Sequence, residues 1–160
     1  MTPRASIAAL LQEMDRQSPA GFAIALHIRF TTPTYLFQSY PGRWLEYYSA
    51  EGLVLYDPTV HWGLQNFGHI RWGDLEPIDS RGVLKKAKDF GLMNGVAIAV
   101  MQSGTRTIGS FARADRDYHD EEMQDLESLL SQLHATTVGA SELSQADKRA
   151  LTELSIRLTH

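Results

Sequence analysis

The sequence predicts an α+β fold in which an antiparallel sheet is sandwiched between helices. β-rich segments occur as a pair near the start of the chain and again as a pair in its second half, with turn residues between the members of each pair. Helical patterns precede, separate and follow the two pairs, and amphipathic helices bury their apolar side by packing on a sheet. With 160 residues, of which 43% are apolar and 21% charged, the chain fits one globular domain with a sizeable core.

The first elements are a helix and a hairpin. Thr2 is suited to the N-cap of a helix and Pro3 to its first position, and the helix is expected to end near Arg16. Its apolar residues recur at helical spacing at Ile7, Leu10, Leu11 and Met14. Two strands follow over 22–30 and 34–39, with a Thr-Thr-Pro turn between them.

Two short helices are predicted in the middle of the chain. The first begins near Gly42 and carries Trp44 and Tyr48, which stand four residues apart and therefore share one face. Gly52 ends this helix. The second begins at an Asp-Pro pair, in which Asp57 is the natural N-cap and the proline takes the first helical position. Capping alone would account for this aspartate.

The second half of the chain predicts one irregular stretch, two helices and a second hairpin. Residues 68–74 have no regular pattern, and a helix is expected over 80–90. Strands follow over 96–101 and 107–112, with a Ser-Gly turn between them. A long amphipathic helix then opens at Asp120, with one apolar stripe made of Met123, Leu126, Leu130 and Leu133. Core packing is the first interpretation of this stripe, and a dimer seam is the second.

Composition excludes several kinds of function. The chain has no cysteine, so it has neither disulfides nor thiolate chemistry, and this is compatible with a cytoplasmic protein. Its net charge of −4 argues against nucleic-acid binding by this segment alone, because phosphate contacts need clustered lysine and arginine. No apolar run is long enough to cross a bilayer. Neither a nucleophile or phosphate-loop motif nor a metal-binding histidine spacing is present, so no cofactor and no metal are expected.

The stretch over 40–72 is rich in large aromatic side chains. It holds all three tryptophans and four of the six tyrosines of the chain, together with Asp57. Such rings offer an apolar body and a hydrogen-bonding group, so around one carboxylate they can line a pocket for a mostly apolar ligand. They can equally form an ordinary aromatic core. Composition leaves both interpretations open.

The spacing within this stretch resembles a known family. Trp44 is followed by Tyr48 four residues later, by Asp57 with its proline nine residues after that, and by Trp72 another fifteen residues on, ahead of Gly95. The chain thereby resembles the autoinducer-binding domain of LuxR-type quorum-sensing transcription regulators. The resemblance implies an α-β-α sandwich with a central antiparallel sheet of about five strands and helices on both faces. It also implies an N-acyl-L-homoserine lactone as ligand, and no catalytic residue.

The roles of the family's residues carry over to this chain as expectations. Trp44 would donate its indole N–H to the lactone carbonyl, Asp57 would accept from the ligand's amide N–H, and Tyr40 would donate to the amide carbonyl. Aromatic side chains would wall the lactone, and apolar ones would enclose the acyl tail. The implied ligand-binding residues in this stretch are Tyr40, Trp44, Tyr48, Asp57, Thr59, Val60 and Trp72.

The far wall departs from the family pattern. Many members have serine or threonine on a strand of the second hairpin, where this chain has Ala112. Ser110 lies two residues earlier on the same strand face, so it is expected to take that role, and both residues are kept as candidates. The segment after Trp72 is shorter than in other members, so its pocket residues remain unassigned. This leaves a second hypothesis open: an orphan or short-form regulator that binds another small amphipathic ligand or serves mainly as a dimerisation or inhibitory module.

A third hypothesis is a small enzyme. His61 lies one helical turn after Asp57, a spacing that is compatible with acid–base hydrolysis of a lactone.

The resemblance instead implies a homodimer that reaches DNA through a C-terminal helix-turn-helix. We therefore expect a ligand-binding domain over 1–140 and the start of that second domain over 141–160, where Ser144 and Asp147 predict a helix start. We expect this second domain to be incomplete in this chain.

Overall fold

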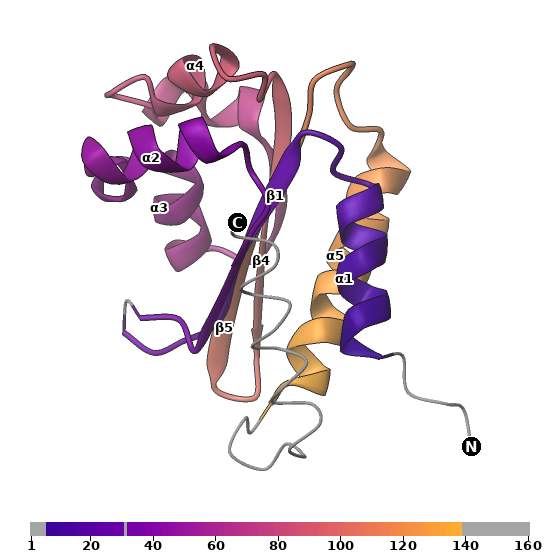
Figure 1. Ribbon diagram of the computed structural model, residues 1–160. Coiled ribbons are helices and arrows are strands. Elements are labelled where there is room, and N and C mark those ends of the chain that lie inside the picture. The colour runs from indigo at the N-terminus through magenta and orange to yellow at the C-terminus, as the bar shows by residue number, and fades with distance from the viewer. Residues whose placement is uncertain (1–5, 31, 139–160) are drawn as a thin grey trace.

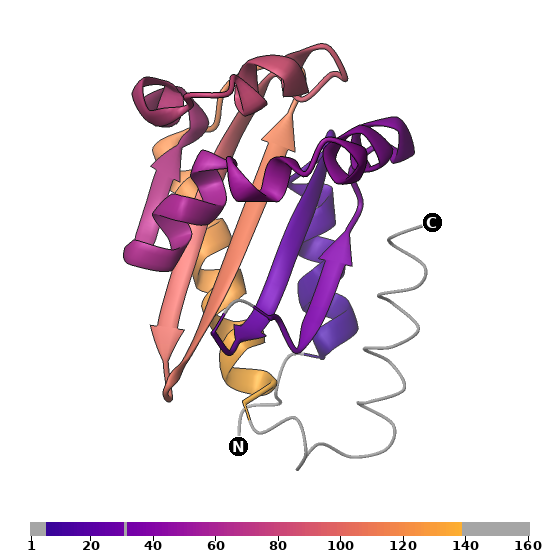
Figure 2. The same cartoon turned by 90° about the vertical axis from the view of Figure 1, so that its left-hand side faces the viewer.

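The computed structural model describes residues 6–30 and 32–138, and within them the fold is a five-stranded sheet between two layers of helices. Helices α1 and α5 cover one face, while α2, α3 and α4 lie on the other, as Figures 1 and 2 show. The strand order is β2-β1-β5-β4-β3, and every neighbouring pair is antiparallel. The predicted α+β sandwich is confirmed.

Both predicted hairpins are present, and the sheet gains one strand that the sequence pattern did not reveal. The strands are β1 (Gly21–Ile28), β2 (Tyr35–Gln38), β3 (Gly68–Arg71), β4 (Asn94–Gln102) and β5 (Thr105–Arg113). The expectation of an irregular stretch over 68–74 is wrong, because this stretch holds β3 and then a 3-10 helix. β3 is a four-residue edge strand that pairs only with β4, so its formation depends on a distant partner rather than on a local apolar pattern.

The helices begin and end mostly where capping residues place them. They are α1 (Ile7–Arg16), α2 (Gly42–Ala50), α3 (Pro58–Gln65), α4 (Val83–Lys88) and α5 (Asp120–Thr136), with 3-10 helices η1 (Leu53–Leu55) and η2 (Trp72–Ile78). The N-cap of α1 is Ser6, whose hydroxyl accepts from the amide of Ala9, and not Thr2, which lies outside the described residues together with Pro3. The segment expected over 141–160 also lies outside them.

Helix α4 is shorter than the helix that was expected over 80–90. Gly82 stands immediately before it with φ of +65°, a conformation that interrupts a right-handed helix. The carboxylate of Asp79 accepts from the amides of Val83 and Leu84 at 2.8 and 2.9 Å, which fixes the new start. Among the described residues, no helix combines the length and the apolar character needed to cross a membrane.

Each face of the sheet has its own apolar core. On one face, the predicted stripe of α5 packs with α1 and with alternate residues of β4, namely Val96, Ile98 and Val100. On the other face, a second core gathers Trp44, Trp72 and side chains of α4. The α5 stripe is therefore core, as expected, and the second core is the one that contains the aromatic stretch.

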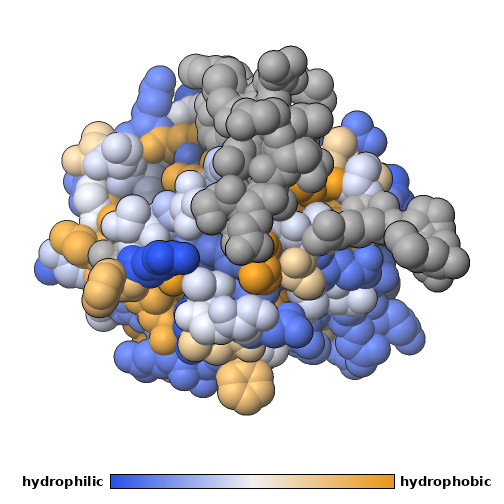
Figure 3. Space-filling model, turned by 90° about the horizontal axis from the view of Figure 1, so that it is seen from below, coloured by the Kyte–Doolittle hydropathy of each residue, from blue (hydrophilic) through white to orange (hydrophobic). Residues whose placement is uncertain are grey.

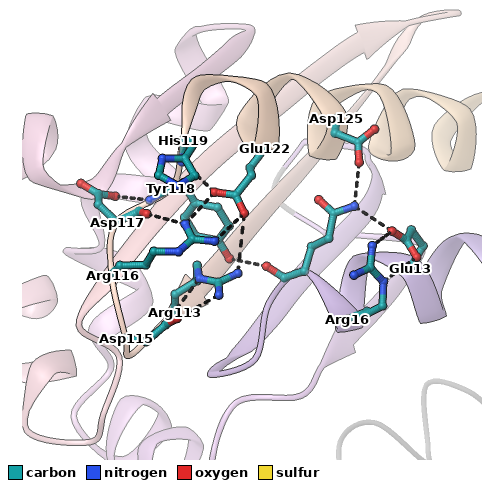
Figure 4. Close-up of polar contacts among 11 residues, drawn as sticks. Glu13, Arg16, Arg113, Asp115, Arg116, Asp117, Tyr118, His119, Glu122 and Asp125 are labelled. Carbon is teal, nitrogen blue, oxygen red and sulfur yellow. Dashed lines mark hydrogen bonds and ion pairs between the residues drawn. The ribbon is translucent and has the colours of Figure 1, made fainter.

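A polar network fastens the start of α5 to its neighbours (Figure 4). Glu122 accepts from both terminal guanidinium nitrogens of Arg116, Nη1 and Nη2, at 2.8 and 2.9 Å and from the amide of His119 at 2.8 Å. Gln17, just after α1, donates to Asp125 of α5 at 2.7 Å. The Arg116 guanidinium lowers the pKa of Glu122 to about 2, so this carboxylate stays charged. The network joins α1 to the N-terminal half of α5.

A second polar cluster lies at the other end of α5, and its two histidines are buried. His27 interrupts the regular pairing of β1 with β5 and has a φ of +49°, and its ring lies 4.2 Å from that of His134. The His27 ring bonds the hydroxyls of Thr105 and Thr137 at 2.6 and 2.8 Å. Burial, with the neighbouring His134 second, lowers the pKa of His27 to about 4. The cluster thus ties β1 to the C-terminal end of α5 through hydrogen bonds of a neutral His27.

Candidate functional site

A cavity of about 480 Å³ lies between the sheet and the helices on the α2–α4 side. Strands β1, β2 and β5 form its floor, and α2, η1, α3 and α4 form its opposite wall. Its volume lies within the range of pockets that enclose small ligands. Eight of the nine residues expected to bind ligand line it, from three separate parts of the chain: Tyr40, Trp44, Tyr48, Asp57, Thr59, Val60, Trp72 and Ser110.

Asp57 is the polar centre of this cavity. It caps α3, with its Oδ1 atom accepting from the amide and the hydroxyl of Thr59 at 2.9 and 2.7 Å. Its Oδ2 atom accepts from the hydroxyl of Tyr48 at 2.8 Å. An Asp-Pro start places the carboxylate here because the capping position points it back at the first amides of the helix. The predicted cap is therefore confirmed, and the same carboxylate faces the cavity.

A hydrogen bond between Trp72 and Ser110 joins the helical wall of the cavity to its sheet floor. The indole N–H of Trp72 donates to the hydroxyl oxygen of Ser110 at 3.0 Å, and the hydroxyl of Tyr40 donates to the Ser110 carbonyl at 3.0 Å. Trp72 lies flat against β4 at Gly95, where an added Cβ atom would fall 2.2 Å from the ring. Only glycine at this position leaves room for the indole.

Trp44 presents a hydrogen-bond donor that the fold itself does not use. Its ring packs against Tyr48 and Phe90, with centroids 5.7 and 5.3 Å away. Among the described residues, none accepts from its indole N–H, yet this atom is not sealed in the core. Because Trp44 is buried and lines the cavity, the N–H is open to an acceptor placed there.

The electrostatics of the cavity favour a neutral ligand. Burial raises the pKa of Tyr40 and of Tyr48, so both hydroxyls keep their protons. Burial also raises the pKa of Asp57, while hydrogen bonds from Thr59 and Tyr48 oppose that rise by stabilising the charged form. Of the described residues that line the cavity, none is lysine or arginine. A ligand carboxylate would therefore find no cation to pair with.

The sequence misplaced one wall residue and missed another wall. Ala112 does not line the cavity; it is fully buried in the aromatic core, two residues beyond Ser110, where the cavity-lining part of β5 ends. Ser110, the other candidate on this strand, does line the cavity. The missed wall is the first hairpin, where Ala23 and Ala25 of β1 and Leu36 of β2 face the cavity. The only signal was the alternation of small and large apolar residues along β1.

Features of other kinds of site are absent from the described part of the chain. The Asp57 carboxylate is occupied by Tyr48 and Thr59, and no hydrogen bond joins it to the ring of His61, although His61 lines the cavity. No cluster of three or more histidine, cysteine, aspartate or glutamate residues capable of holding a metal ion occurs within residues 6–30 and 32–138.

Comparison with known proteins gives one consistent result. Residues 14–137 match the family described as autoinducer binding domain. The chain is 29% identical over 94 residues to the transcriptional activator protein LuxR of Aliivibrio fischeri, a match that covers 55% of this chain and 37% of LuxR. It is 30% identical over 114 residues to the activator VanR of Vibrio anguillarum, covering 68% of this chain and 48% of VanR. The chain thus spans less than half the length of these relatives.

The fold is also found in a solved structure. SdiA in complex with octanoyl-rac-glycerol superposes on the chain with a TM-score of 0.65 at 19% identity, over 96% of this chain and 71% of SdiA. At that identity the likeness concerns the fold.

Proposed function

The chain belongs to the autoinducer-binding domain family of LuxR-type transcription regulators, and from that premise we propose that it is a sensor domain which binds an N-acyl-L-homoserine lactone in the aromatic cavity. One observation carries the proposal. The closed, polar end of the cavity offers the N–H donor of Trp44, which has no acceptor among the described residues, and a carboxylate at Asp57, beside a long apolar space.

Counting the hydrogen bonds of the cavity shows what a ligand must supply. Asp57 already accepts three hydrogen bonds and retains acceptor capacity on Oδ2, so it matches one ligand donor. The N–H of Trp44 matches one ligand acceptor. An acyl-homoserine lactone has one amide N–H for Asp57 and a lactone carbonyl for Trp44, and both partners are needed because an unpaired polar atom in a dry pocket is costly.

The amide carbonyl of the ligand needs a different donor from the one expected. The hydroxyl proton of Tyr40 is already donated to the Ser110 carbonyl. The hydroxyl of Ser110 accepts from Trp72 and keeps its own proton, so it can donate into the cavity. We assign the contact with the amide carbonyl to Ser110 and give Tyr40 the role of wall and support.

Ligand binding would act through mass action. A ligand held only by the folded domain stabilises it by about 2.7 kcal/mol at a hundred times the Kd. In the relatives, the matching region is one part of a transcriptional activator rather than of an enzyme. By that likeness we extend the proposal to a cytoplasmic homodimer that acts on DNA through a helix-turn-helix beginning within 141–160.

A second ligand class has support of its own. The SdiA structure named above holds octanoyl-rac-glycerol, an acylated molecule with hydroxyl groups in place of an amide. A glycerol hydroxyl can donate to Asp57 as an amide does. The orphan or short-form regulator that binds such a molecule, or that serves mainly for dimerisation, is therefore the alternative.

Thermal melting of the chain with N-octanoyl-L-homoserine lactone and with octanoyl glycerol separates the two ligand classes. Trp44→Phe keeps the ring contacts and removes the donor, so we expect the lactone-induced rise in Tm to fall sharply while the ligand-free Tm changes little. Trp62→Phe is the matched control, because Trp62 lies in the same stretch but does not line the cavity. An equal effect of both substitutions, or no shift with any lactone, would refute the lactone proposal.

A further inference from the structure

Within residues 6–30 and 32–138, the cavity is closed at its polar end and open at its apolar end. At the polar end, Trp44, Trp72 and Asp57 are 4%, 7% and 8% exposed. At the other end, Val54, Leu55 and Leu64 line the same cavity but are 50%, 69% and 36% exposed. The apolar lining therefore continues to the surface. Figure 3 looks at the molecule from below and shows hydrophobic residues exposed on this face among the described residues.

The pairing of β1 with β5 gives the direction and the length of the cavity along the sheet. Ala23 lies opposite Ser110, at the polar end, and Ile28 lies opposite Arg106, four residues back along β5. The lining thus extends roughly 13 Å along the strands, at about 3.3 Å per residue. Figure 2 shows that the described helices cross the upper part of this face, whereas none crosses the lower ends of β1 and β2. An acyl chain that starts beside Ser110 and runs along β1 toward Ile28 would leave the cavity at that lower end.

One side of the opening is held fixed. The guanidinium of Arg106 donates to the carbonyls of Gly63 and Asn66, the first at 2.8 Å, and so ties the end of α3 to β5. At Gly63 the helix lies directly on Ile108, where an added Cβ atom would be 2.8 Å from that side chain. The opening must lie on the other side, between the first hairpin and the segment that carries Val54 and Leu55.

We propose that this opening lets the end of an unbranched acyl chain leave the cavity, so the domain has no upper limit on acyl length and prefers long-chain ligands. The inference rests on the proposed function and specifies its ligand. The closed end fixes the polar head, and the distal methylenes lie against Val54, Leu55 and Leu64 at the surface. A methylene fully buried in the cavity increases affinity about fourfold, and one at the half-exposed rim increases it less.

The test is a series of Kd measurements at concentrations below micelle formation. N-butanoyl-, N-octanoyl-, N-dodecanoyl- and N-tetradecanoyl-L-homoserine lactones are titrated into the wild-type chain, with monoacylglycerols of the same chain lengths in parallel. We expect affinity to rise steeply up to the octanoyl chain and to keep rising more gently beyond it. The double substitution Val54→Ser, Leu55→Ser should weaken the two longest ligands about tenfold and leave the butanoyl ligand unchanged.

Ile78→Ser is the matched control, because Ile78 is an exposed apolar residue, 57% accessible, that does not line the cavity. It should leave the whole series unchanged. An abrupt loss of affinity beyond the octanoyl chain, or equal weakening of every length by the double substitution, would overturn the open-end inference. If no lactone binds but the glycerols follow the same length series, the lactone proposal fails and the open end stands. Failure of both series overturns both.

Discussion

At the scale of single residues, the tightest constraint is the contact between Trp72 and Gly95. The glycine is the only residue that lets the indole lie against β4 and reach Ser110. Gly95→Ala should therefore lower the free energy of unfolding by about 1–3 kcal/mol, the usual range for overpacking, and should also abolish ligand binding because Trp72 is displaced. Chemical denaturation with and without ligand measures both effects.

The control for this prediction is Gly42→Ala, where an added Cβ atom meets nothing within 4 Å. That substitution should leave both stability and binding nearly unchanged. Full ligand affinity in Gly95→Ala would contradict the structural role that we give to Trp72.

The buried His27 predicts how stability depends on pH. Its pKa is about 4 in the folded chain and 6.5 when unperturbed, so the unfolded chain takes up the proton first as the pH falls. The stability that is linked to His27 is fully present above pH 6.5 and is lost progressively down to about pH 4, by up to about 3 kcal/mol. Denaturation across this range should show the slope, and His27→Gln should flatten it.

His61→Gln serves as the comparison for this experiment, since His61 is an exposed histidine. It should leave the slope unchanged. A His27→Gln chain that kept the full slope between pH 6.5 and pH 4 would assign the acid sensitivity to other groups.

At the scale of elements, the start of α5 depends on Glu122. This carboxylate accepts from the His119 amide and from Arg116, and its folded pKa of about 2 lies below its ordinary value of 4.5. The stability it provides is present above pH 4.5 and lost as the pH falls toward 2. Glu122→Gln should cost about 1–2 kcal/mol at neutral pH. Glu121→Gln, in the same helical turn, should cost much less, and thermal melting compares the two.

Most elements could be predicted because their signals are local. The stripe of α5, the two hairpins and the Asp57 cap each follow from neighbouring residues, and each is present. β3 could not be predicted, since four residues at a sheet edge form a strand only by pairing with β4. The same holds for the shortened α4, where one residue with positive φ, Gly82, decides the start.

The site could be predicted in part for the same reason. The aromatic wall has rare residues at fixed intervals, which the sequence displays directly. The sheet wall consists of small residues such as Ala23 and Ala25, and alanine in a strand has no pattern that distinguishes a pocket floor from a core. Whether Ser110 or Ala112 faces the cavity depends on where the cavity ends along β5, and only the packing of the helices sets that limit.

At the scale of the whole molecule, the two separate cores predict an uneven response to ligand. In the core between α1, α5 and the sheet, neither helix contributes a described residue to the cavity wall. The core on the other face surrounds the cavity. Ligand should therefore slow amide hydrogen exchange most in α2 and α3 and much less in α5. Exchange measured by mass spectrometry, with and without ligand, checks this. Equal slowing in both layers would mean that the cores unfold as one unit.

The double role of Asp57 has a consequence for how such domains diverge over evolutionary time. A descendant that lost its ligand would still need this aspartate to begin α3, so selection for folding alone would preserve it. The N–H of Trp44 has no partner among the described residues, and another aromatic ring could retain its packing. Drift away from sensing should therefore erase the tryptophan first. Among related chains, we expect the residue at that position to distinguish domains that still sense a ligand from those that keep only the fold.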